Sequence, residues 1–301
     1  MNKRRKLTQF IHRFDKGFTV VELLVASTVS LLLLAMALES TNSMRRLYMH
    51  DIVRTRLNED IRGTLDIVGV NIRQSGENLA RGFPAIQIID GASGAPDHLV
   101  LHRNLLDEVL AVCVALTAGS TTSDIVFADG TTTQGCDYAS NNRNYTSWQN
   151  YRLADSNQSV RAYIYNISSK AGEFFNFISE TDTGTQYLIS RQAGTWGNNY
   201  DVGSSAVYIL EKWEFRVVDD VLQLIVDGQE DNALDVAFGI QDFQVSAHMN
   251  DGTDKSALTS ADDWTDIAYL NLTISADDSF GGQSISSTLS SRYFPRNILS
   301  N

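Results

Sequence analysis

An apolar run from Phe18 to Leu38 limits what this chain can fold into more than any other feature. It has 21 residues and one charged side chain, Glu22. As an α-helix it would span about 30 Å, which is the thickness of the hydrocarbon core of a bilayer. No other segment reaches 18 apolar residues. The sequence therefore predicts one transmembrane helix over residues 18–38.

Charge is distributed unevenly around this run. Residues 1–17 carry six basic side chains and Asp15, which gives them a net charge of +5. The net charge of the whole chain is −12, so the remaining residues together carry −17. Basic residues before a span favour a cytoplasmic N-terminus, so we expect residues 77–301 on the far side of the membrane. An acidic body repels phosphate backbones, and no nucleic-acid partner is expected.

Two simpler interpretations of the run leave something unexplained. A secretory signal peptide has a shorter apolar core followed by a cleavage site of small residues, whereas the segment after this run reads LESTNSMRRLYMH. A plain membrane anchor accounts for the length of the run but not for Glu22. A carboxylate within lipid is costly and usually functional.

The segment KGFTVVE, residues 16–22, resembles the class III signal of type IV prepilins. The resemblance implies that residues 1–17 are a basic leader and that a prepilin peptidase cuts between Gly17 and Phe18. It also implies that Phe18 is then N-methylated and that Glu22 is the fifth residue of the mature chain. Because the cut precedes the apolar run, the helix stays on the mature protein.

If the chain is a prepilin, Glu22 is expected to act in the assembly of subunits into a filament. In a filament the helices pack without water, so an isolated carboxylate or an isolated terminal amine would be costly. We expect Glu22 to offset the amine of Phe18 in a neighbouring subunit, or its own. The pair would fix the register between helices that otherwise slide easily.

The helix is expected to continue beyond the membrane over residues 39–76. Apolar residues recur there at helical spacing, with polar residues between them. The stripe consists of Met44, Leu47, Val53, Leu57, Ile61, Leu65, Val68 and Ile72. Gly76 suits the left-handed position that ends a helix. The result is a helix of about 55 residues, half in lipid and half in the body, as in the spine of a type IV pilin.

After Arg81 the pattern changes to short runs rich in Val, Ile, Tyr and Phe, separated by turn residues. Asp219-Asp220 between two such runs predicts a hairpin turn. The loops at 137–150 and 250–263 are expected to be exposed. One long helix followed by many antiparallel strands places the chain in the α+β class, with the spine packed on a β-rich domain over residues 77–301.

The resemblance extends into the C-terminal half. The segments EKWEFRVVDDVLQLIVDG and DIAYLNLTISA resemble the C-terminal half of PilW-type minor pilins, and LDIVGVNIRQSGEN resembles the end of their spine helix. The J-type pseudopilins of type II secretion share this arrangement. Residues 104–200 resemble nothing known. Major pilins usually carry a proline at the place of Glu39 and often a glycine near that of Leu31. Their absence here favours a minor subunit.

The chain has two cysteines, Cys113 and Cys136. In an exported body this pair predicts one intramolecular disulfide, whereas in a cytosolic protein two unrelated thiols would be more usual.

We find no motif of a hydrolase, nucleotide-binding protein or zinc protease, so we expect no enzyme activity and no cofactor. His98 and His102 are four residues apart, but in a strand-like run, and are expected to be ordinary rather than metal-ligating. Acidic residues in C-terminal loops could bind calcium through their carboxylate oxygens. Their spacing is not that of an EF-hand, however, and a solvated acidic loop is the simpler interpretation. These residues are Asp251, Asp254, Asp262, Asp263 and Asp266.

Three functions remain. The first is a minor pilin that primes a type IV pilus and enters it near the tip. The second is a minor pseudopilin of a type II secretion system. The third is a tip adhesin or docking module formed by residues 104–200. The expected partners are the prepilin peptidase, minor and major pilins, the inner-membrane assembly platform and inner-membrane lipid. The body is expected in the periplasm before assembly and on the pilus, outside the cell, afterwards.

Overall fold

The computed structural model describes residues 18–300. It contains two α-helices, five short 3-10 helices and fifteen strands within these residues. The helices are α1 (Val20–Gln74), α2 (Asn142–Ala154), η1 (Ala92–Gly94), η2 (Ala139–Asn141), η3 (Glu230–Asn232), η4 (Trp264–Asp266) and η5 (Arg296–Ser300). The predicted leader, residues 1–17, lies outside the described residues. The chain divides into two compact units, one ending at Val53 and the other beginning at Arg54, so α1 contributes to both.

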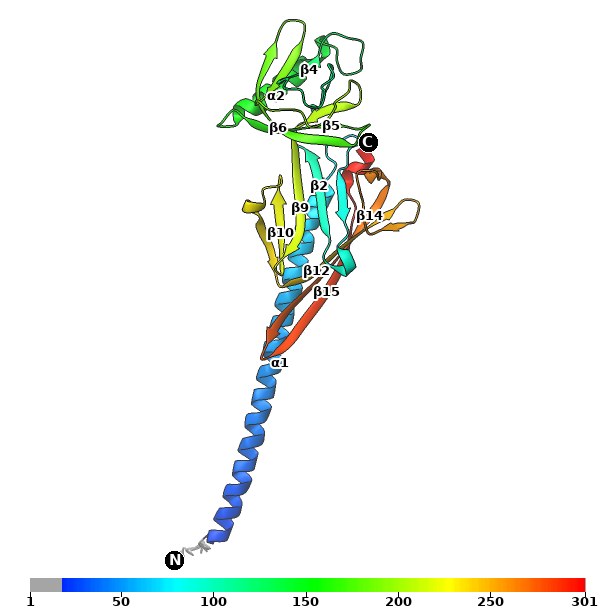
Figure 1. Cartoon of the computed structure of the whole chain (residues 1–301). Helices are drawn as coiled ribbons and strands as arrows, with labels where there is room; N and C mark the ends of the chain where they lie inside the picture. Colours follow the sequence, from blue (N-terminus) through cyan, green and yellow to red (C-terminus); the bar gives the residue numbers. More distant parts are fainter. Residues whose placement is uncertain (1–17, 301) are drawn as a thin grey trace, which may run out of the picture. The chain divides into compact units, whose positions relative to one another are not determined.

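The strands form three antiparallel sheets. A five-stranded sheet has the order β1-β2-β9-β10-β11, with β1 (Ile86–Ile89), β2 (His98–Asn104), β9 (Leu210–Val218), β10 (Val221–Val226) and β11 (Leu234–Phe238). A four-stranded sheet has the order β13-β12-β14-β15, with β12 (Ile240–Met249), β13 (Asp254–Lys255), β14 (Ile267–Phe280) and β15 (Gln283–Tyr293). The predicted α+β class, a long helix followed by antiparallel sheets, is confirmed (Figure 1).

The second half of α1 packs on these two sheets through the predicted apolar stripe. The side chains of Leu57, Ile61, Leu65, Val68 and Ile72 are buried. On the same face, Gly69 lies against the ring of Tyr293 in β15 so closely that an added Cβ would come within 2.1 Å of it. The side chain of Ser287 in β15 donates to Asn58 at 2.6 Å. Helix and sheets therefore share one core.

Gly76 ends α1 as predicted. Its φ is +78°, and its backbone N–H donates to the carbonyl of His102 in β2 at 2.8 Å. An added Cβ at this position would lie 2.2 Å from the ring of Trp264. A residue with a side chain could not take this conformation and still leave room for Trp264.

The two-residue loop at Asp219-Asp220 also forms as predicted. It joins β9 to β10, with Val218 opposite Val221. Both aspartates have positive φ, 50° and 61°. Positive φ at both central residues is the geometry of a type I′ turn, which matches the twist of the paired strands.

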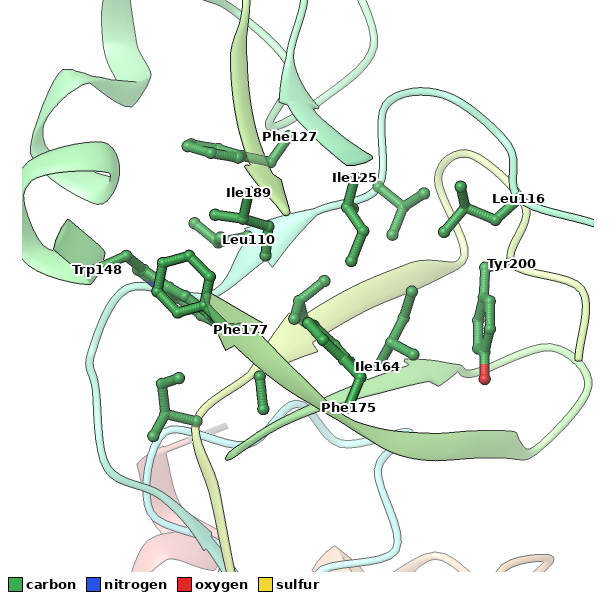
Figure 2. Close-up of a cluster of buried hydrophobic side chains, with 14 of the residues drawn as sticks. Leu110, Leu116, Ile125, Phe127, Trp148, Ile164, Phe175, Phe177, Ile189 and Tyr200 are labelled. Atoms are coloured by element: carbon green, nitrogen blue, oxygen red, sulfur yellow. The ribbon is translucent and has the colours of Figure 1, made fainter. Parts of the chain in front are cut away.

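Residues 104–208, most of which resemble nothing known, build a third sheet with a core of its own. Its order is β3-β8-β5-β6-β7-β4. The strands are β3 (Leu110–Ala111), β4 (Asp124–Ala128), β5 (Val160–Asn166), β6 (Ala171–Asp182), β7 (Tyr187–Arg191) and β8 (Ser205–Tyr208). Figure 2 shows Trp148, Phe175 and Phe177 meeting aliphatic side chains such as Ile125 and Ile189 in this core. We call this part the six-stranded lobe.

The expected exposed loop at 137–150 is wrong, because helix α2 occupies residues 142–154. Trp148 is fully buried, and its indole N–H donates to the carbonyl of Glu108 at 2.8 Å. Arg152 forms a bidentate ion pair with Glu180 of β6: its Nε donates to Oε2 at 2.7 Å and its Nη2 donates to Oε1 at 2.8 Å. The sequence of this helix did not indicate a helix, because most of its residues are polar and only one narrow face is apolar.

The run AVYILEKWEFRVV, residues 206–218, is rich in strand-forming residues but does not form a single strand. It divides at Ile209 into β8 of the six-stranded lobe and β9 of the five-stranded sheet. Residues 206–210 read AVYIL, and those from Val207 to Leu210 are all buried, so no polar or turn residue marks the change of sheet. One continuous stretch of chain therefore connects the lobe to the part of the body that packs on α1.

Candidate functional site

The start of helix α1 carries two of the residues singled out in the sequence, Phe18 and Glu22. Thr19 immediately precedes the helix, and its Oγ1 accepts from the backbone N–H of Glu22 at 3.2 Å. In return, Glu22 Oε2 accepts from the backbone N–H of Thr19 at 2.9 Å and from its hydroxyl at 3.0 Å. This reciprocal arrangement is a capping box, which satisfies backbone donors that the first turn leaves without partners.

The capping role of Glu22 was missed in the sequence, although its signal is present there. Thr19-Val20-Val21-Glu22 places Thr and Glu three residues apart directly before an apolar run, which is the capping-box pattern. Glu22 Oε1 has no hydrogen-bond or ion-pair partner among residues 18–300. One oxygen therefore caps the helix of its own chain, while the other can accept from an amine of another chain.

The apolar side chains around this site are exposed. Phe18 is 88% exposed, and the most apolar 18-residue window of α1 has a mean hydropathy of 2.3 with none of its residues buried. The core helix of a water-soluble domain would have this window buried. By length and composition the helix is able to cross a membrane, and its apolar surface needs lipid or other helices around it.

Gly17, the residue predicted to precede the cleaved bond, lies outside the described residues. Phe18 and Thr19 are described and lie just before helix α1. The predicted cleavage between Gly17 and Phe18 and the methylation of Phe18 therefore stay predictions from the sequence.

The two cysteines meet in the six-stranded lobe. Cys113 and Cys136 form a disulfide, with their Cα atoms 5.7 Å apart. The backbone carbonyl of Cys136 accepts from the N–H groups of Asp129 and Gly130, just after β4. Asp129 and the two sulfur atoms are the one group of three potential metal ligands that we find within residues 18–300. Both sulfur atoms are joined to each other, so neither offers a thiolate to a metal.

The histidines of β2 have separate partners. His102 is buried, and its Nδ1 lies 3.0 Å from the carbonyl of Pro84, to which it donates. Burial lowers the pKa of His102 to about 4, so the ring is neutral near pH 7. His98 is partly exposed, and its Nδ1 lies 3.6 Å from Glu214 Oε1.

Several carboxylates of the acidic C-terminal loops pair with basic side chains of the protein itself. Lys255 donates to Asp262 at 2.5 Å and lowers the pKa of that carboxyl. Arg81 donates to Asp263 at 2.5 Å, and Asp254 pairs with His248 at 2.7 Å. These hydrogen bonds and ion pairs hold the carboxylates of Asp254, Asp262 and Asp263 against basic side chains.

Residues 12–38 match the family model of the prokaryotic N-terminal methylation motif. The chain has a prepilin-type N-terminus. The match covers the predicted cleavage position, the capping box and the apolar run, and it supports a relation to type IV pilin-like proteins. No curated protein matches the chain. No solved structure matches it either. The match supports processing by a prepilin peptidase, pilin-type partners and anchoring in a membrane.

Proposed function

We propose that this prepilin-type protein is a minor pilin, which primes the assembly of a type IV pilus and is incorporated near its tip. The observation that carries the proposal is the methylation motif at residues 12–38, placed at the start of an exposed apolar helix. In this role the protein is a structural part, without catalysis. Its partners are other pilins and the assembly platform of the inner membrane.

The course of α1 supports a minor rather than a major subunit. The helix is uninterrupted from Val20 to Gln74, with neither a proline at position 39 nor a glycine at position 31. The PilW-type resemblance of the C-terminal half points the same way. A minor pseudopilin of a type II secretion system would perform the same mechanical task with the same parts, and it is the alternative.

The six-stranded lobe favours a second, additional role as a tip-binding module. It has its own sheet and its own core, and α1 buries its stripe on the other two sheets. A lobe that the spine does not need is free to serve recognition. We therefore propose that residues 104–208 face a target or a tip protein.

The test combines processing with localisation. Mass spectrometry of the membrane form should find a mature chain that begins with methylated Phe18. Gly17→Leu should leave the leader attached, because a peptidase needs close backbone access at that position, and should keep the protein out of sheared filaments. A wild-type chain that still begins at Met1, or that is processed but absent from both pili and a secretion pseudopilus, would contradict the proposal.

A further inference from the structure

A groove lies between helix α1 and the edge strand β11. It is lined by Gly63, Thr64 and Ile67 of the helix and by Val236 and Phe238 of the strand. The ring of Phe238 is 69% exposed and the side chain of Ile67 is 44% exposed. Large apolar side chains gathered beside a hollow are typical of an interaction surface, whereas single exposed apolar residues are common everywhere.

The rim of this groove is acidic. A second hollow continues from Phe238 past Asp60, Asp277 and Asp278 to Arg56. Arg56 is paired with Asp278. Glu59, Asp60 and Asp277 have no ion-pair partner within residues 18–300. An occupant of the groove should therefore be apolar where it meets Phe238 and Ile67, and basic at its flanks.

Residues 44–54 have this composition. They read MRRLYMHDIVR, with a net charge of +2, and belong to helix α1. The side chains of Met44, Leu47 and Tyr48 are 64–69% exposed. Arg45 and Arg46 have no ion-pair partner among the described residues. They lie beyond the apolar run predicted to cross the membrane, so lipid tails do not cover them.

We propose that the groove between α1 and β11 receives residues 44–54 of a second copy of this chain. The inference rests on the proposed function, because it needs subunits that stand side by side with their helices in one membrane or filament. The two surfaces are different patches of one chain, so the contact is heterologous. In a pair of copies, such a contact leaves one groove and one segment 44–54 unused, and these can meet the other pilins that surround a minor subunit.

The test uses two full-length copies with different tags in the same cells, one carrying Tyr48→Cys and the other Phe238→Cys. The native cysteines are already paired, and both altered positions are exposed, so the fold is kept. Mild oxidation of membranes and sheared filaments should give a disulfide-linked dimer that carries both tags. The matched control replaces Phe238→Cys by Val202→Cys, which is exposed but belongs to the region that follows β7, and it should give background yield.

A charge exchange tests the recognition itself. Asp60→Lys in the Phe238→Cys copy should lower the yield of the mixed dimer about fivefold, because an exposed attraction becomes a repulsion. Arg46→Glu in the other copy should restore it. A mixed-dimer yield equal to the Val202 control, or a link from position 238 to a different protein instead of the second copy, would overturn the inference. If processed protein enters filaments without this link, the inference fails while the proposed function stands.

Discussion

Thr19 and Glu22 cap helix α1 reciprocally, through hydrogen bonds of 2.9 to 3.2 Å between each side chain and the other residue's backbone N–H. The carboxylate at the start of an apolar helix therefore has a role within its own chain, in addition to the assembly role predicted from its charge. The two roles use different properties of Glu22. Capping needs an acceptor oxygen, whereas pairing with an amine needs the negative charge.

Three substitutions separate the two roles. Glu22→Gln keeps an acceptor and removes the charge, Glu22→Ala removes both, and Thr19→Ala removes the partner in the cap. Loss of a cap costs about 0.5–2 kcal/mol, whereas leaving one member of a buried charge pair alone costs about 3–5 kcal/mol. We expect Gln and Ala at position 22 to abolish incorporation into filaments, and Thr19→Ala to reduce it only slightly.

The measurement is an immunoblot of sheared filaments and membranes for the processed protein. Membrane insertion and cleavage should be normal in all three variants, since neither depends on a charge at position 22. If Glu22→Gln enters filaments at the wild-type level while Glu22→Ala and Thr19→Ala do not, the cap rather than the charge is the essential feature.

The parts of the fold that were predictable from sequence depend on local patterns. The apolar stripe of α1, Gly76 at its end and the turn at Asp219-Asp220 are each set by residues close in sequence. The partition of strands among three sheets depends on pairing over long distances, such as Leu101 opposite Trp213, and no local pattern contains it. The capping box is readable as a local motif too, since Thr19 and Glu22 are three residues apart directly before the apolar run.

Helix α2 is set by a local pattern, but its sequence predicted a loop. Its only fully buried side chain with a large ring is Trp148, and the neighbouring Tyr145 and Tyr151 are partly buried against the same core. Three aromatic residues at three-residue spacing mark one face of a helix. Asn, Arg, Thr, Ser and Gln fill the rest of the segment, and their preference for turns suggested a loop instead.

Two glycines of α1 offer a matched pair. Gly69→Ala would place a Cβ 2.1 Å from the ring of Tyr293, which is buried, so it should destabilise the protein by about 1–3 kcal/mol. Gly63→Ala meets no atom within 4 Å and should stabilise the helix by about 0.5–1 kcal/mol. Urea unfolding of the full-length protein in detergent, followed by tryptophan fluorescence, measures both. Equal effects of the two substitutions would contradict the close packing of Gly69.

The disulfide should stabilise the six-stranded lobe. The bond between Cys113 and Cys136 joins residues 23 apart, and closing a loop of that length is worth about 3 kcal/mol by the chain-entropy estimate. Cys113→Ala with Cys136→Ala should lower the free energy of unfolding by about this amount without changing the sheet order. Thiol labelling of the unfolded wild-type protein, before and after reduction, provides the control. Equal labelling in the two samples would show that the bond does not form in the cell.

His102 should make stability depend on pH. Its pKa is about 4 in the folded protein and about 6.5 when unfolded, so the unfolded chain binds the extra proton between these values. The contribution of the neutral ring is complete above pH 6.5 and is lost as the pH falls toward 4. Between pH 7 and 4.5 the wild type should lose about 2–3 kcal/mol more than His102→Gln, which keeps a donor for Pro84. Carboxylates with lowered pKa, such as Asp262, weaken both proteins alike and cancel in the comparison. Parallel pH profiles of the two proteins, measured by urea unfolding in detergent, would show that His102 is not held neutral by burial.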